Sequence, residues 1–132
     1  MSLKRVITEF GTGNDLHGGD YTKAAVRAVQ DAIHHSSLTL IRSLGVDAKT
    51  MQVEVTVGVQ QPEKVELAAV KSALPHGQVT VRAVKGGLDV ADDDGGDTAA
   101  IATCNHVSAR LLERKPRMRP SPWTNPSTAT KP

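Results

Sequence analysis

The sequence predicts an α/β fold, a two-layer sandwich with helices on one face of a small mixed β-sheet. Residues 51–59 alternate apolar and polar side chains, which is the period of a half-buried strand, and residues 21–35 carry apolar side chains at helical spacing. Other segments complete the order β-α-(α)-β-α-β-β. Because both β-α-β crossovers take the same right-handed sense, their helices are expected on one face of the sheet.

A strand, a loop and a helix are predicted within the first 35 residues. Residues 3–10 are rich in β-branched side chains and should form a strand, whereas residues 11–20 contain four glycines and should form a loop. The alanine-rich helix over residues 21–35 is expected to begin with Asp20 as its N-cap, because a carboxylate accepts hydrogen bonds from the free N–H groups of a first helical turn.

The chain up to residue 112 continues this alternation. The expected elements are a short helix from Ser36 or Ser37 closed by Gly45, a strand over 51–59, a helix over 63–74, a strand over 78–84, a Gly/Asp loop over 85–97 and a strand over 98–112. The last two strands are expected to pair antiparallel through that loop. Since helices would cover only one sheet face and residues 99–102 are apolar on both faces, we expect a homo-oligomer in which another copy covers the second face.

Charge is unevenly divided along the 132 residues. Residues 113–132 carry a net +4 within a whole-chain charge of +2, which leaves −2 for residues 1–112. The same segment holds five of the seven prolines, and such a Pro/Arg-rich composition is expected to stay disordered. The sequence therefore predicts one α/β domain over 1–112 and a tail over 113–132. The tail could contact RNA or acidic partners, but few aromatic residues are available for base stacking, so a solubilising extension is favoured and nucleic acid is not an expected partner.

Three features bear on location. No run of about 18 apolar residues is present, so no membrane-spanning helix is expected. The first residues show no signal-peptide pattern, and Cys104 is the single cysteine, which rules out a disulfide within one copy. We therefore expect a cytoplasmic protein.

The loop over residues 11–20 is the strongest candidate for a functional site. Asp15 and His17 lie two residues apart, which would direct both side chains to the same side of an extended segment. A carboxylate beside an imidazole can serve as an acid–base pair or bind a divalent metal such as zinc. Asp15 and His17 are therefore the candidate catalytic residues and the candidate metal ligands, and no redox cofactor is expected.

The remaining loop residues suit a small ligand, because glycines permit close backbone approach and a helix N-terminus favours an anionic group. The candidate substrate-binding residues are Gly11, Gly13, Gly18 and Asp20. The alternative interpretation is a glycine-rich turn in which Asp15 and Asp20 only cap backbone amides and His17 is exposed.

Common nucleotide and calcium motifs do not fit. A dinucleotide-binding loop would need glycine at Leu16, and no Gly-Lys-Ser/Thr follows as in a phosphate-binding loop. The acidic run over residues 92–97 lacks the alternating ligands of an EF-hand, so a solvated hairpin is favoured there.

Cys104 and His106 are weaker candidates on the last predicted strand. Simple alternation places both on one face, with Asn105 on the other. They could complete a metal site with Asp15 and His17, because N-terminal and C-terminal strands often pair. A buried cysteine and a half-exposed histidine is the favoured alternative.

The segment Gly11-x-Gly13-x-Asp15-x-His17-Gly18 resembles the GxGxDxHG motif of a small family of functionally uncharacterised proteins, found in scattered bacteria and, with a long N-terminal extension, in plants. The resemblance continues through most of residues 3–112. It includes Thr22-Lys23-Ala24-Ala25, Ser36-Ser37-Leu38, the strand over 51–59 and Gly86-Gly87-Leu88. The family implies no activity, and it usually has small apolar residues where this chain has Cys104 and His106.

A second, local resemblance concerns the metal hypothesis. Methylerythritol cyclodiphosphate synthase also runs from a first strand into Gly-x-Gly-x-Asp-x-His, where the Asp and His bind a divalent metal together with a more distant His. The resemblance implies that Asp15 and His17 are two metal ligands. No histidine of this chain lies at the matching distance, since His34 and His35 come too soon.

Two classes of function follow from these observations. The first is a small oligomeric enzyme with its site on Asp15 and His17, a lyase, cyclase or hydrolase acting on a small polar or anionic substrate, with or without a metal. The alternative is a non-catalytic module that binds a metabolite through the glycine loop. In both classes the expected partners are a second copy of the chain and a small-molecule ligand.

Overall fold

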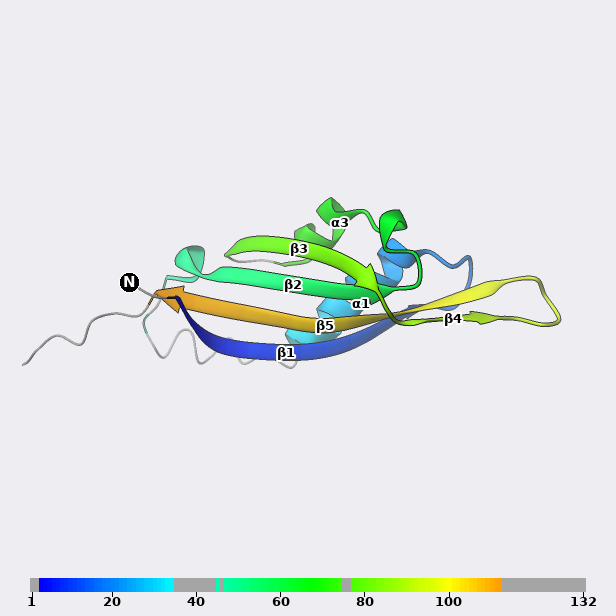
Figure 1. Ribbon diagram of the computed structural model, residues 1–132, viewed down its shortest axis with the longest axis horizontal. Helices are drawn as coiled ribbons and strands as arrows, with labels where there is room; N and C mark the ends of the chain where they lie inside the picture. The colour runs from blue at the N-terminus through cyan, green and yellow to red at the C-terminus, as the bar shows by residue number, and fades with distance from the viewer. Residues whose placement is uncertain (1–2, 35–44, 46, 75–76, 113–132) are drawn as a thin grey trace, which may run out of the picture.

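The computed structural model describes residues 3–34, 45, 47–74 and 77–112 (Figure 1). Its strands are β1 (Leu3–Asp15), β2 (Gln52–Val59), β3 (Gln78–Lys85), β4 (Leu88–Ala91) and β5 (Thr98–Leu112). Its helices are α1 (Tyr21–His34) and α3 (Leu67–Ser72), with short 3-10 turns at Ala48–Thr50 and Pro62–Lys64. The predicted mixed α/β class is confirmed, and the described part of the chain is richer in strand than in helix.

The strands form one mixed sheet in the order β1-β5-β2-β3, with β4 pairing to β5 beyond the end of β2. β5 is antiparallel to β1, β2 and β4, whereas β2 and β3 are parallel. The expected pairing of β3 with β5 is therefore wrong. β5 lies between β1 and β2 instead, and its antiparallel hairpin partner is β4, a strand within the segment that was expected to be a loop.

One core joins the sheet to the helices. α1 packs against β1, β5 and β2, and α3 contacts both α1 and β3. The buried face of α1 consists mainly of small residues (Ala24, Ala25, Ala28, Val29 and Ala32), and it meets alternate valines of β2 (Val53, Val55, Val57 and Val59). Since strand side chains alternate between faces, the even-numbered residues of β2 point to the opposite side.

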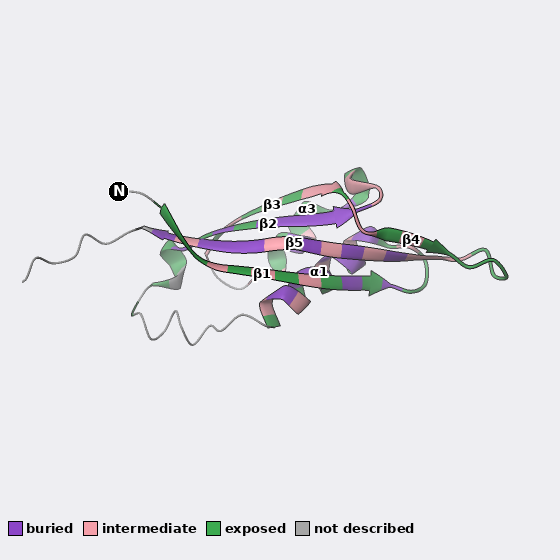
Figure 2. Cartoon of the chain, turned by 60° about the horizontal axis from the view of Figure 1, so that its bottom comes forward, coloured by how far each residue is buried: buried purple, intermediate pink, exposed green. Residues whose placement is uncertain are grey.

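We call that opposite side the open face, because neither α1 nor α3 covers it. It carries side chains from all five strands, assigned by cross-strand register. They include Arg5, Phe10, Glu54, Thr56, Thr80, Arg82, Leu88, Val90, Ile101, Thr103, His106 and Arg110. Several are apolar and exposed, so the sheet has one packed face and one face with solvent-exposed apolar side chains. Figure 2 shows exposed residues along β1 and β4.

The expected helix over residues 63–74 is interrupted. Val65 has an extended backbone, with φ −80° and ψ 125°, and its side chain is buried. The Glu66 N–H donates to Thr22 Oγ1 at 3.0 Å. Because α1 thus holds the chain at this point, only Leu67–Ser72 becomes α-helical.

The other predicted segments of the domain agree with the structure within a few residues, except that β1 runs five residues beyond its expected end at residue 10. The short helix expected from Ser36 or Ser37 and the tail over 113–132 lie outside the described residues.

Candidate functional site

Gly11 and Gly13 lie within β1, where α1 crosses the strand at close range. A Cβ added at Gly11 would lie 2.4 Å from the Ala28 carbonyl oxygen, and one at Gly13 would lie 2.2 Å from the Ala28 backbone nitrogen. Both distances are far shorter than a van der Waals contact, so only glycine permits this approach. The structure thus corrects the expected loop over residues 11–20. Residues 11–15 continue the strand, and both glycines face the helix, which leaves no room for a ligand on that side.

Asp15 ends β1 and is only 7% exposed. The Asp20 N–H donates to Asp15 Oδ2 at 2.9 Å, and Arg27 Nη1 lies 3.5 Å from Oδ1. Arg27 also donates to the Asn14 carbonyl oxygen at 2.6 Å. Asp15 therefore closes the loop over residues 16–19 by binding the backbone on its far side.

Asp20 is the N-cap of α1, as predicted. Its Oδ1 accepts hydrogen bonds from the N–H groups of Thr22 at 3.0 Å and Lys23 at 3.1 Å. These are the amides that were expected to hold an anionic ligand. Because the Asp20 side chain accepts their hydrogen bonds, the helix N-terminus has fewer free N–H groups for an anionic substrate than the sequence suggested.

His17 is the candidate side chain that the loop presents to solvent, with 89% of its side chain exposed. Its Nδ1 lies 3.2 Å from Oδ2 of Asp97, the residue before β5. Asp97 Oδ1 accepts from the Gly18 N–H at 2.9 Å and from the Thr98 N–H at 2.8 Å. These backbone hydrogen bonds, followed by that of His17, hold the pKa of the Asp97 carboxyl below its usual value.

This geometry is that of a carboxylate-oriented imidazole. When Nδ1 carries the proton and faces Asp97, Nε2 is left as an acceptor toward solvent. The backbone reaches this arrangement through Gly18 and Gly19, which have φ values of +88° and +59°. Such values are favourable for glycine and rare for other residues.

The sequence did not single out Asp97, which lies in the acidic run assigned to a solvated hairpin. The strand order would have located it. Asp15 at the end of β1 is opposite Ala100 near the start of β5, so residues just after β1 and just before β5 share one edge of the sheet.

The structure gives Asp15 and His17 different partners. Asp15 is nearly buried and bonded to backbone, whereas His17 is exposed and faces Asp97. Among the described residues, no three His, Cys, Asp or Glu side chains come together as a metal-binding group.

Cys104 and His106 lie on opposite faces of the sheet, contrary to the expectation from simple alternation. Thr56 is opposite His106 and the next residue, Val57, is opposite Cys104, so Asn105 is an extra residue in β5. A β-bulge of this kind reverses which positions face the core. Cys104 is buried against the helices, and burial raises the pKa of its thiol to about 11. Cys104 and His106 therefore cannot bind one metal ion together.

A second polar cluster lies near the start of α1. Tyr21 Oη donates to Asp89 Oδ2 at 2.5 Å and accepts from Gln61 Nε2 at 3.2 Å. The hydrogen bond to Asp89, with burial, raises the pKa of the Tyr21 hydroxyl. Asp89 lies between Leu88 and Val90, which are both exposed in β4. The apolar–acidic–apolar alternation of these three residues is the sequence signal that could have predicted this strand and an Asp89 on its other face.

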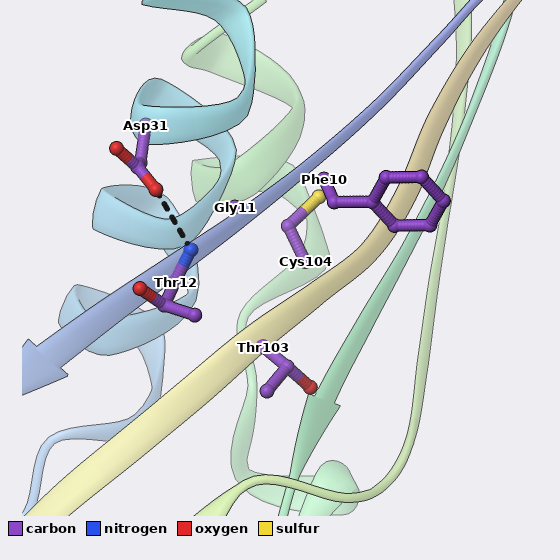
Figure 3. Close-up of a pocket in the computed structure, with 6 residues that line it drawn as sticks. All are labelled: Phe10, Gly11, Thr12, Asp31, Thr103 and Cys104. Carbon is purple, nitrogen blue, oxygen red and sulfur yellow. Dashed lines mark hydrogen bonds between the residues drawn. The ribbon is translucent and has the colours of Figure 1, made fainter.

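A hollow on the protein surface lies beside the central part of β1 (Figure 3). It is lined by Phe10, Gly11, Thr12, Asp31, Thr103 and Cys104, and encloses about 580 Å³. Asp31 of α1 accepts the Thr12 N–H at 2.9 Å, which satisfies an amide on the outer edge of the strand. The Phe10 ring turns away from Asp31, and the protonated Cys104 thiol is a poor nucleophile, so the hollow shows no catalytic group.

Fold and loop together define a small mixed α/β protein that holds one histidine at the edge of its sheet through side chain-to-backbone hydrogen bonds. The chain belongs to the Lin0512 family of conserved hypothetical proteins, whose family model matches residues 5–107. The expected resemblance to an uncharacterised family is confirmed to this extent, while the GxGxDxHG motif as the mark of that family stays a prediction.

A crystal structure from Nostoc punctiforme, described as an FtsZ-like protein of unknown function, is similar to this chain. The two share 35% identity, the match covers 86% of this chain and 99% of that one, and the TM-score is 0.75. No match was found among curated proteins. Within the described residues, no helix is long and apolar enough to cross a membrane.

Proposed function

We propose that this protein is a small cytoplasmic enzyme that performs acid–base chemistry on a small polar or anionic substrate, with His17 as the group that transfers the proton. The pairing of His17 Nδ1 with Asp97 at 3.2 Å carries the proposal. Lyase, cyclase and hydrolase reactions all suit one positioned base, and none of them needs a redox cofactor.

Each neighbouring residue has a role in this proposal. Asp97 orients the imidazole and would stabilise its protonated form after Nε2 accepts a proton, since its two backbone hydrogen bonds keep it ionised. Asp15 and Gly18 are positioning residues, because they set the course of the loop that carries His17. Their contacts explain why Asp15 and Gly18 of the GxGxDxHG segment occupy these positions, and these contacts require no bound ion.

Metal binding remains a second form of the proposal, with a divalent ion such as zinc at His17. The oxygen of Asp97 that faces His17 is the nearest candidate carboxylate, and Asp15 would have to give up its hydrogen bond to Asp20 to join. Because two ligands fill only half of a tetrahedral shell, acid–base work without a metal is the better supported version.

A non-catalytic ligand-binding module is the alternative, and the exposure of His17 favours it. An imidazole that is 89% exposed in one copy has little shelter from water, whereas enzyme sites usually exclude it. We propose that a second copy supplies that shelter, in a homo-oligomer in which it covers the open face.

The test of catalysis uses hydrolysis of p-nitrophenyl acetate, a general probe of a positioned imidazole, with metal analysis of untagged protein alongside. His17→Gln should lower the rate at least about tenfold and Asp97→Asn by a smaller factor, with circular dichroism unchanged. His34→Gln, which removes an exposed imidazole at the other end of α1, is the matched control and should have no effect. A wild-type rate no higher than that of free imidazole would favour the binding module.

A further inference from the structure

The open face is divided into an acidic end, an apolar middle and a basic end along the strand direction. In the middle, Phe10 is 64% exposed and Leu88 is 56% exposed. Leu88 pairs with Ile101, and Phe10 lies at the level between Cys104 and Val107 of β5. These side chains form an apolar patch on a face that the described helices leave uncovered.

The basic end lies where β1 begins and β5 ends. Arg5 is directly opposite Arg110. Arg82 of β3 lies at the level of Thr56 and His106, four residues nearer the middle of the face, and its Nη2 donates to Thr56 Oγ1 at 3.2 Å. The one carboxylate among them, Glu54, lies 3.7 Å from Arg110. Two arginines against one carboxylate leave this end positive, and Arg82 adds a further positive charge toward the middle of the face.

A hollow of about 170 Å³ lies between the basic end and the middle of the open face. It is lined by Glu54, Val55, Thr56, Thr80, Arg82 and His106. The open face is therefore recessed next to the basic end, where Arg82 and His106 line the hollow together with Glu54.

The acidic end is the tip of the hairpin formed by β4 and β5, which projects beyond the rest of the sheet (Figure 1). Asp92, Asp93 and Asp94 are all exposed there. Asp92 accepts the Asp94 N–H and so shapes the turn, and Asp97 is bonded to the loop of His17. Asp93 and Asp94 are exposed and place their charges in solvent.

We propose that two copies of this chain dock through their open faces in opposite strand directions, so that the acidic hairpin tip of each copy lies on the basic end of the other. A twofold contact of this kind requires that every group on the face find its complement at the symmetric position. Charge on this face meets that requirement, since one end is acidic and the other basic.

The strand register places the twofold axis near Thr103. Arg110 lies seven residues beyond Thr103 in β5, about 23 Å at roughly 3.3 Å per residue, and Thr98 lies five residues before it, about 17 Å, with the acidic turn continuing a few ångströms further. The two charged ends are therefore at similar distances on either side. Phe10 lies about two residue levels from Thr103 toward Arg110, and Ile101 lies two levels away on the other side, so Phe10 of one copy would come to the level of Ile101 of the second copy.

This contact supplies the residues of the proposed homo-oligomer and does not depend on catalysis at His17. It also bears on the site, because Asp97 stands at the base of the hairpin and binds both His17 and Gly18. Docking of the hairpin would hold Asp97 in place. The mass measurement below tests the interface, and the rate measurement above tests His17 separately.

The test is sedimentation velocity of the full chain at micromolar concentration, where we expect twice the 14.0 kDa mass of one copy and weaker association at high salt. Two variants reverse the charges, Asp93→Lys with Asp94→Lys, and Arg5→Glu with Arg110→Glu. Each should weaken the dimer at least about 30-fold, because like charges would face each other across the contact. The matched control, Lys49→Glu with Lys71→Glu, reverses two exposed charges outside the open face and should leave the mass unchanged.

Mixing the two reversed variants gives the decisive result. In a mixed pair, each lysine-bearing tip meets a glutamate-bearing end and each native tip meets a native basic end, so the dimer mass should return. The proposal is overturned by a monomeric wild type, by a trimer, by reversals that leave the mass unchanged, or by a mixture that fails to restore it while both variants are folded.

Discussion

The glycines of the GxGxDxHG segment are required for two different structural reasons. Gly11 and Gly13 have ordinary strand backbones and are needed because a Cβ at either position would lie only 2.4 Å or 2.2 Å from a backbone atom of α1. Gly18 has open space around it and is needed for its φ of +88°. The first pair is a packing requirement and the second a requirement of backbone conformation.

This contrast separates the half of the motif that the fold explains from the half that forms the candidate site. The strand half buries its glycines against alanines and can be explained by the fold alone. The loop half uses hydrogen bonds from Asp15 and Asp97 to fix a loop of a few residues whose projecting polar side chain is His17. A rigid surface loop around an exposed imidazole is costly in conformational entropy, which favours a functional role for His17.

The largest effect is expected from Gly13→Ala. The new Cβ would lie 2.2 Å from a backbone nitrogen of α1, so the helix must move away from the sheet, at a cost of about 3 kcal/mol or more in the free energy of unfolding. Urea denaturation followed by circular dichroism measures it. A loss below about 1 kcal/mol would show that α1 can shift freely, and the packing role would fail.

Gly18→Ala should have a smaller effect. An added Cβ meets no atom within 4 Å, so the cost is that of a left-handed backbone at a residue other than glycine, about 1 kcal/mol. The same variant should disturb the hydrogen bond from Gly18 to Asp97 and lower any activity of His17 by more than its stability loss explains. If Gly13→Ala and Gly18→Ala destabilise equally, the two halves of the motif do not differ as argued.

Much of the fold was predictable from the sequence, because its periodicities are local. The helix over 21–35 and the strands over 51–59, 78–84 and 98–112 are set by the spacing of apolar residues and by an N-cap at Asp20. The predictions that were wrong concerned features that depend on contacts between distant segments. The interruption at Val65 arises from Thr22 of α1, and the place of β5 between β1 and β2 depends on the whole sheet.

The candidate site was predictable in part for the same reason. Asp15 and His17 were identified from the loop, and the alternative interpretation foresaw both a capping Asp15 and an exposed His17. Asp97 was missed because its partner is 80 residues away in the chain. The bulge at Asn105, which places Cys104 and His106 on opposite faces of the sheet, also cannot be recognised from the pattern of apolar residues.

Asp97→Asn probes the loop half through pH. The folded state holds the Asp97 pKa below 3.8, so the ionised carboxylate stabilises the fold above that pH, and this contribution is lost as pH falls through the folded pKa. The melting temperature of the wild type should therefore exceed that of the variant at pH 6, by less than the Gly18→Ala difference, and the gap should close toward pH 2. A gap that is independent of pH would mean that the Asp97 charge does not stabilise the loop.

The smallest effect is expected in the reactivity of Cys104, which is directly opposite Gly11 in the sheet. This reactivity reports the local packing around the thiol rather than the free energy of unfolding. Since α1 can lie over this strand pair only because residue 11 is glycine, burial of the thiol depends on the packing half of the motif. With a pKa raised from 9.0 to about 11, the thiolate population at pH 8 is about a hundredfold lower than for an ordinary cysteine, and access is blocked as well. Reaction of the folded protein with Ellman's reagent should therefore be slow, faster in Gly11→Ala and unchanged in Gly18→Ala. Equal acceleration by both substitutions would contradict the separation of the two halves, because it would mean that the loop also controls the packing of α1 on the sheet.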